Sequence, residues 1–149
     1  MIILGIDPGS KGGISVLQDK KVIFSQPFDN QTLCDILKRY HFDMVAVEQV
    51  HSMPVDGKKQ CFSFGANYGF IIGALTVYEY EIHYVSPQKW KKYYGLIKQD
   101  KQASIDKCKE LFNVNLLPTI RCKKEHDGMA ESILIANYIR DGTYGVTEK

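Results

Sequence analysis

The sequence predicts an α/β fold in which a mixed five-stranded sheet is flanked by helices on both faces. Five short runs of apolar and β-branched residues have the length of buried strands. The first three runs follow one another across short turns, whereas the later ones alternate with segments whose apolar residues recur at helical spacing. A meander followed by strand–helix alternation is typical of a mixed sheet with a helical layer on each side.

The first half of the chain supplies four of the strands. Residues 2–7 form a continuous apolar run, and the glycines after it indicate a tight turn before the strands at 13–18 and 21–27. Helical spacing then predicts a helix over 31–40, and 44–48 is a second buried strand. The turn glycines are Gly9, Gly12 and Gly13, and the apolar helix positions are Leu33, Ile36, Leu37 and Tyr40.

The second half contains one strand and four helices. After a polar loop at 50–60, a helix is expected from about 62 to 78, and it is followed by a strand at 82–85 that Ser86 and Pro87 close. The remaining helices are expected near 87–94, 100–112 and 127–140.

Length and composition fit one domain over residues 1–149, with 44% hydrophobic and 24% charged residues. The net charge is only +2, so a nucleic-acid surface must come from local clusters of charge. The longest apolar run, at 70–77, is far below the roughly 20 residues that span a bilayer. With no recognisable signal peptide, we expect a cytoplasmic protein without membrane association. Its cysteines lack zinc-type spacing and are expected to be small buried side chains: Cys34, Cys61, Cys108 and Cys122.

Four carboxylates stand out, although they lie far apart in the sequence. Asp7 and Glu48 each end a predicted buried strand, where a carboxylate needs hydrogen-bond partners or a cation. Asp127 and Glu131 are four residues apart at the start of a helix, so both leave the same helical face. Taken alone, Asp7 could be a turn cap, and Asp127 and Glu131 could be solvated first-turn acids. Glu48 is less easily explained, because glutamate is a poor turn former and a poor strand residue. Together, the four predict a cluster of negative charge suited to divalent metal.

Such a cluster predicts a metal-dependent nuclease. Two hard divalent cations about 3.5–4 Å apart can activate water and stabilise the leaving oxygen of a phosphodiester. Magnesium prefers carboxylate oxygens to histidine or cysteine. The histidines, at positions 41, 51, 83 and 126, lack H-x-x-x-H spacing and are weak candidates for ligands. His126 is interpreted either as a helix-start residue or as a proton shuttle beside Asp127.

A lysine-rich segment predicts contact with nucleic acid. Residues 87–101 hold five lysines and one acid, with aromatic residues between them, a composition that suits phosphates and exposed bases. Trp90 itself is expected in the core. The five lysines are Lys89, Lys91, Lys92, Lys98 and Lys101, and two smaller basic clusters are Lys58 with Lys59 and Arg121 with Lys123 and Lys124.

The helix expected at 62–78 has two further features. Phe62 and Phe64 follow the basic pair at 58–59, and they fit either a wedge into distorted DNA or ordinary core packing. Glycine recurs every four residues at positions 65, 69 and 73, although each glycine in a helix costs about 1 kcal/mol relative to alanine. This glycine stripe predicts close approach of another backbone, either the sheet or a partner subunit.

Six segments occur in an order that is specific as a set, although Asp-Pro-Gly alone also resembles a phosphate loop of sugar kinases. They are Ile-Leu-Gly-Ile-Asp-Pro-Gly (3–9), Val-Ala-Val-Glu-Gln-Val (45–50), Gly-Ala-Asn-Tyr-Gly (65–69), Val-Ser-Pro-Gln-Lys-Trp-Lys (85–91), Asp-Lys-Gln-Ala (100–103) and His-Asp-Gly-Met-Ala-Glu-Ser-Ile-Leu-Ile-Ala (126–136). With them, nearly the whole chain resembles the RuvC family of Holliday junction resolvases, especially its short phage-borne members.

The resemblance implies a ribonuclease-H-like fold, a homodimer, and Mg²⁺- or Mn²⁺-dependent cutting of branched DNA, with two ions per subunit. Four-way junctions are the expected substrate, with forks and three-way junctions as further ones, and a phage-encoded member would act in the host cytoplasm. It implies that Asp7, Glu48, Asp127 and Glu131 hold the metals and that Lys101 lies near the scissile phosphate. The expected DNA contacts are Gly9, Ser10, Lys58, Lys59, Phe62, Phe64, Lys89, Lys91, Lys92, Lys98 and Lys101.

The chain departs from the family pattern at its last acid. Most members have aspartate where this chain has Glu131, and typical bacterial members space the last two acids by three residues rather than four. Two other activities fit the residues: a ribonuclease-H-type nuclease on RNA–DNA hybrids, which uses the same carboxylates, and a junction-binding protein without catalysis. The second is disfavoured, because negative charge facing phosphate does not help a pure binder.

Overall fold

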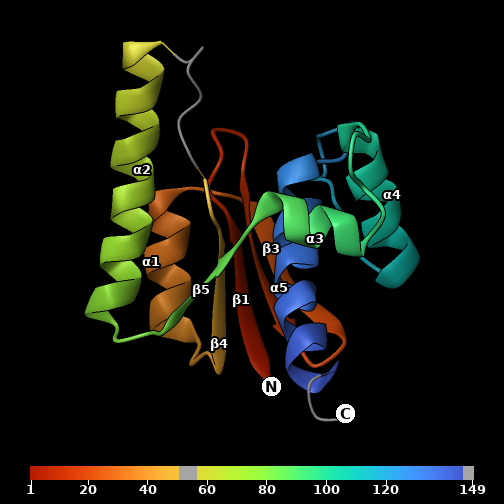
Figure 1. Cartoon of the computed structure of the whole chain (residues 1–149), viewed down its shortest axis with the longest axis horizontal. Coiled ribbons are helices and arrows are strands. Elements are labelled where there is room, and N and C mark those ends of the chain that lie inside the picture. Colours follow the sequence, from red (N-terminus) through yellow and green to blue (C-terminus); the bar gives the residue numbers. More distant parts are fainter. Residues whose placement is uncertain (51–56, 146–149) are drawn as a thin grey trace.

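The computed structural model describes residues 1–50 and 57–145, so His51 and most of the predicted loop at 50–60 lie outside the described residues. Its strands form one five-stranded sheet in the order β3-β2-β1-β4-β5 (Figure 1). The first three strands are antiparallel neighbours, and β1, β4 and β5 run parallel. The bounds match the prediction at every strand: β1 Ile2–Asp7, β2 Gly13–Gln18, β3 Lys21–Pro27, β4 Met44–Glu48 and β5 Ile82–Val85.

Helices cover both faces of the sheet, as predicted. On one face lie α1 (Asn30–Arg39) and α2 (Lys58–Val77). On the other face lie α3 (Pro87–Tyr93), α4 (Lys101–Leu111) and α5 (Asp127–Gly145) (Figure 1). In the described part of the chain, no helix combines the length and the apolar character that crossing a membrane requires.

Two helices extend beyond their predicted bounds. α2 begins at Lys58 rather than at 62. The prediction missed this start because the first three residues of the helix are exposed and polar and therefore carry no apolar periodicity. Gly57 precedes it in an extended conformation, without a side-chain cap that would mark the start. α5 continues to Gly145 rather than ending at 140, although Asp141 and Gly142 resemble a turn in the sequence.

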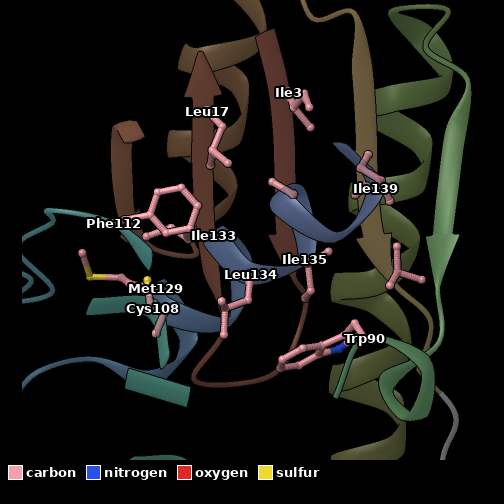
Figure 2. Packing of buried hydrophobic residues seen from close by; sticks show 14 of the residues in the cluster. Ile3, Leu17, Trp90, Cys108, Phe112, Met129, Ile133, Leu134, Ile135 and Ile139 are labelled. Carbon is pink, nitrogen blue, oxygen red and sulfur yellow. The ribbon is translucent and has the colours of Figure 1, made fainter. Parts of the chain in front are cut away.

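Alternation along the strands assigns each residue to one face. Leu4 and Ile6 pack toward α1 and α2, whereas Ile3 on the same strand packs toward α3–α5. Trp90 is fully buried in the second layer, which confirms its predicted place in the core (Figure 2). Of the free cysteines, only Cys108 is buried. The prediction was wrong for the others, which lie on α1, on the first turn of α2 and in the loop before α5.

Candidate active site

The ends of two neighbouring parallel strands bring Asp7 and Glu48 together. β1 and β4 are paired up to Ile6 and Val47, the residues just before the two acids. By the two-residue alternation of a strand, both carboxylates leave the sheet on the side of α5. Asp7 is 7% exposed and Glu48 is 8% exposed, so both are buried acids at one edge of the sheet.

Glycines let α5 start against the end of β1. Gly12, in the turn after β1, forms a bridge with Gly128 in the first turn of α5. A Cβ atom on Gly13 would collide with the backbone of Gly128, and one on Gly128 would collide with the backbone of Lys11 and Gly12. Only glycine permits this backbone contact, which places the first turn of α5 beside the buried acids.

Electrostatics show that three of the acids share one site. The pKa of Asp7 is raised well above its usual value, chiefly by burial and then by the negative charges of Glu48 and Glu131. Burial also raises the pKa of Glu48, against a hydrogen bond from Trp90 that lowers it. Clustered carboxylates of this kind repel one another until a proton or a cation neutralises them.

The two glutamates are held by donors from different helices. Trp90 donates its indole N–H to Oε1 of Glu48 at 2.8 Å, and both side chains are buried. Ser104, a buried residue of α4, donates its hydroxyl to Oε1 of Glu131 at 3.1 Å. Each glutamate therefore has one oxygen fixed by a neighbouring side chain, which orients the carboxylate.

Asp127 and Asp7 have different partners. Lys101 forms an ion pair with Asp127, at 3.0 Å between Nζ and Oδ2, and the Lys101 side chain is 70% exposed. This contact with Asp127 is the first cause of the raised pKa of Lys101, and the charges of Glu131 and Asp7 add to it. Oδ1 of Asp7 accepts the backbone N–H of Gly9 at 3.0 Å, as in a turn-capping aspartate. Lys101 thus borders the acid cluster. Its place near a scissile phosphate stays a prediction.

The donor chemistry of the cluster fits a hard divalent cation. Asp7, Glu48, Asp127 and Glu131 offer only carboxylate oxygens, which magnesium and manganese accept. Among the described residues, however, no three acid, histidine or cysteine side chains are already arranged as ligands around one point. Asp127 is turned toward Lys101, and Glu131 toward Ser104. The expected two-ion site therefore stays a prediction.

The lysine-rich segment lies on the same side of the sheet as α5. Lys89 and Lys92 are exposed on α3, and Lys98 is exposed in the following loop with a left-handed backbone (φ 59°). Lys91 is half-buried, and its ammonium lies 5.3 Å from the centre of the Trp90 ring, where a cation–π contact forms. Three of these lysines are thus free to meet phosphate, and Lys91 instead covers Trp90.

A groove of about 1120 Å³ runs between the turn after β1 and the first turns of α2. Ser10, Lys59 and Phe62 line it. Phe62 is 80% exposed, so the core-packing interpretation is wrong for this residue. Phe64 is half-buried and stacks on Tyr68 with 6.4 Å between ring centres. Lys58 is exposed at the first position of α2. The basic pair at 58–59 therefore belongs to α2 rather than to the predicted loop.

His126 starts α5. Its Nδ1 accepts the backbone N–H of Met129 at 3.2 Å, and burial lowers the pKa of the imidazole. This contact satisfies a free backbone N–H in the first turn of α5, which confirms the helix-start interpretation. The sequence analysis missed Trp90 and Ser104 as partners of the acids, since no spacing rule connects residues so distant along the chain.

No family model and no curated protein sequence matches the chain. Solved structures do match it. Thermus thermophilus RuvC in complex with a Holliday junction substrate is 16% identical to this chain and gives a TM-score of 0.67, and the match covers 96% of this chain and 97% of the RuvC chain. Fowlpox virus resolvase with Holliday junction DNA is 18% identical, at coverages of 94% and 99% and a TM-score of 0.57. The yeast mitochondrial resolvase Ydc2 is 15% identical, at coverages of 90% and 76% and a TM-score of 0.52. The chain therefore has the ribonuclease-H-like fold of RuvC and other Holliday junction resolvases, as its motifs predict.

Proposed function

We propose that this chain is a divalent-metal-dependent endonuclease that cleaves Holliday junctions and other branched DNA. The observation that carries the proposal is the meeting of Asp7, Glu48 and Glu131 at one sheet edge, with Asp127 and Lys101 beside them. This cluster occurs in a chain with the fold of proteins whose structures contain Holliday junction DNA. Such an activity belongs to DNA recombination and repair.

The side chains divide the chemistry between them. Asp7 and Glu48 are fixed by strands and are the rigid ligands of the proposed site, while Asp127 and Glu131 join them from the first turns of α5. Bound Mg²⁺ or Mn²⁺, in two ions, supplies water activation and stabilisation of the leaving oxygen. Lys101 is exposed enough to move from Asp127 to a phosphate oxygen, where its charge stabilises the charge that develops there.

The surface around the cluster suits a branched, negatively charged substrate. Lys89, Lys92 and Lys98 are exposed on one side of it, and the first turn of α2 presents Lys58, Lys59 and Phe62 on the other. None of these lysines forms an ion pair with another described residue. Lysine side chains that form no ion pair can bind phosphates, and an exposed aromatic ring can stack on a base that has left the duplex.

We also propose that the protein is a homodimer that pairs through the outer face of α2. A Cβ atom added to Gly65, Gly69 or Gly73 would meet no atom of the described residues within 4 Å, so the glycine stripe does not serve packing within that part of the chain. Apolar side chains are exposed on the same helix, with Phe62 and Val77 near its two ends. A second backbone that packs on this stripe would explain why glycine is kept in a helix interior.

The deciding experiment is incubation with a synthetic four-way junction, with and without Mg²⁺. We expect strand cleavage only with the metal, and forks and three-way junctions are tested as further substrates. In Asp7→Asn, cleavage should fall by more than about a thousandfold, the effect of several kcal/mol of lost transition-state stabilisation. Binding to the junction in EDTA should persist in the variant.

Two controls separate the alternatives. Asp106→Asn changes an exposed acid of α4 outside the cluster and should cut like the parent. An RNA–DNA hybrid replaces the junction in a parallel reaction. Preference for the hybrid would make the chain a ribonuclease-H-type enzyme, and metal-independent binding without any cleavage would make it a junction-binding protein.

A further inference from the structure

The loop between α4 and α5 ends in an exposed apolar tip among cations. Ile120 is 100% exposed, more than any other large hydrophobic side chain in the described ranges. Arg121, Lys123 and Lys124 follow it and are exposed, and within those ranges none of the three has an ion-pair partner. An isoleucine in water adds no buried surface to the folded chain, and its full exposure leaves the whole side chain available to an external surface.

The tip is held in place rather than hanging free. The backbone N–H of Cys122 donates to the carbonyl of Thr119 at 3.0 Å, which closes a turn around Ile120. At the base of the loop, His126 donates its backbone N–H to the carbonyl of Leu116 at 2.8 Å. A turn that is closed and tied at its base loses little entropy when it binds.

The loop borders the candidate active site. Lys123, Lys124 and Gln102 line one hollow of about 570 Å³, and Gln102 is the neighbour of Lys101 on α4. The loop leads directly into the first turn of α5, which carries Asp127. In Figure 1 the start of α2 and the α4–α5 loop lie on opposite sides of the strand ends. The acid cluster therefore lies between two tips that each combine an exposed apolar side chain with cations.

We propose that residues 119–124 form a second DNA-contacting element, in which Ile120 inserts at an unstacked step of the branch and the neighbouring cations hold the flanking phosphates. This inference rests on the proposed function and adds a residue set to it. Apolar side chains that enter between base steps kink and unstack the duplex, and this unstacking costs less at a branch point, where stacking is already weakened. A single apolar residue among three cations suits DNA better than a protein partner, whose contact would need a larger apolar core.

The wedge is tested by binding in EDTA, so that cleavage does not interfere. The variant is Ile120→Ser, and the probe is a four-way junction with 2-aminopurine at the branch point, compared with a linear duplex. We expect the parent to raise the 2-aminopurine emission, and Ile120→Ser to bind the junction about tenfold more weakly without that rise. Affinity for the linear duplex should stay within about twofold. Ile23→Ser, at an exposed site on the edge strand β3, is the matched control and should behave like the parent.

The cations are tested separately on the linear duplex. Replacing Arg121, Lys123 and Lys124 together by alanine should weaken binding and lower the slope of log affinity against log salt by about 1 for each lost phosphate contact. An unchanged slope, or an Ile120→Ser variant that binds and unstacks the junction like the parent, overturns the proposal. A parent that binds junctions no better than duplex contradicts the proposed function instead, and the salt slope still decides whether the loop contacts DNA.

Discussion

The helical layers on the two faces of the sheet differ in how much of their surface they bury. From Gly128 to Ile139, α5 is almost entirely buried against the sheet and its neighbouring helices. α2, on the opposite face, buries only Ile71 and Leu75 along 20 residues. The buried layer contains the acids and the side chains that orient them, whereas the exposed layer offers a surface. The buried layer keeps the carboxylates fixed, and the exposed layer leaves a surface for a large substrate.

The same residue type plays opposite roles in the two layers. Gly128 touches backbone on the side where a Cβ would be, but Gly69 faces open space. Glycine in α5 thus serves close packing within the chain. Glycine in α2 has no such role inside the chain, which is why we assign it to a partner subunit.

The largest expected effect tests this contrast directly. Gly128→Ala should destabilise the chain by about 3 kcal/mol or more, because the methyl group must displace the backbone of the turn after β1. Gly69→Leu is the matched variant, and it should stay folded because its side chain meets open space. Thermal unfolding measures the first effect, and sedimentation should show Gly69→Leu shifted toward the monomer. If Gly69→Leu is a folded dimer like the parent, α2 is not the pairing face.

An intermediate effect is expected for the donor that orients Glu48. Trp90→Phe keeps a ring in the core but removes the N–H that holds the carboxylate. Losing such an outer partner typically costs 10- to 100-fold in metal affinity, so we expect weaker Mn²⁺ binding of about that size, measured by electron paramagnetic resonance. Tyr93→Phe removes a donor to Asp141 from the same helix, outside the site, and should leave Mn²⁺ affinity unchanged. Equal losses in both variants would mean that α3 acts only through packing.

The smallest expected effect is a gain in stability without metal. The raised pKa of Asp7 means that its ionisation destabilises the folded chain, so stability present at low pH is lost as pH rises through the folded-state pKa. In EDTA at neutral pH, Asp7→Asn should therefore unfold at a temperature a few degrees higher, the shift that about 1 kcal/mol produces in a domain of this size.

The pH dependence is the control for that experiment. The advantage of the Asp7→Asn variant should shrink as pH falls below 3.8, the ordinary pKa of aspartate, because the Asp7 carboxyl is then protonated in both the folded and the unfolded chain. An advantage that is independent of pH would show that the gain does not come from the Asp7 charge.

The sequence predicts those parts of the fold that depend on local pattern. All five strands have the predicted bounds, because each is a short apolar run between turn residues. The start of α2 was missed, since Lys58 and Lys59 bury nothing and leave no periodic signal. The carboxylates were found because acids at strand ends are unusual. Their partners Trp90 and Ser104 were not found. Trp90 lies 42 positions from Glu48 and Ser104 lies 27 positions from Glu131, and contacts over such distances in sequence depend on tertiary packing.

The hydrogen bond between Trp90 and Glu48 has a practical consequence. The chain contains one tryptophan, so its indole emission comes from a single place, which is in contact with the acid cluster. Any event that changes the charge or the orientation of Glu48 changes the electric field on that ring. The wavelength of the Trp90 fluorescence should therefore shift when a cation binds, when the cluster is protonated or when a phosphate docks. The unlabelled protein thus carries its own optical probe of the site.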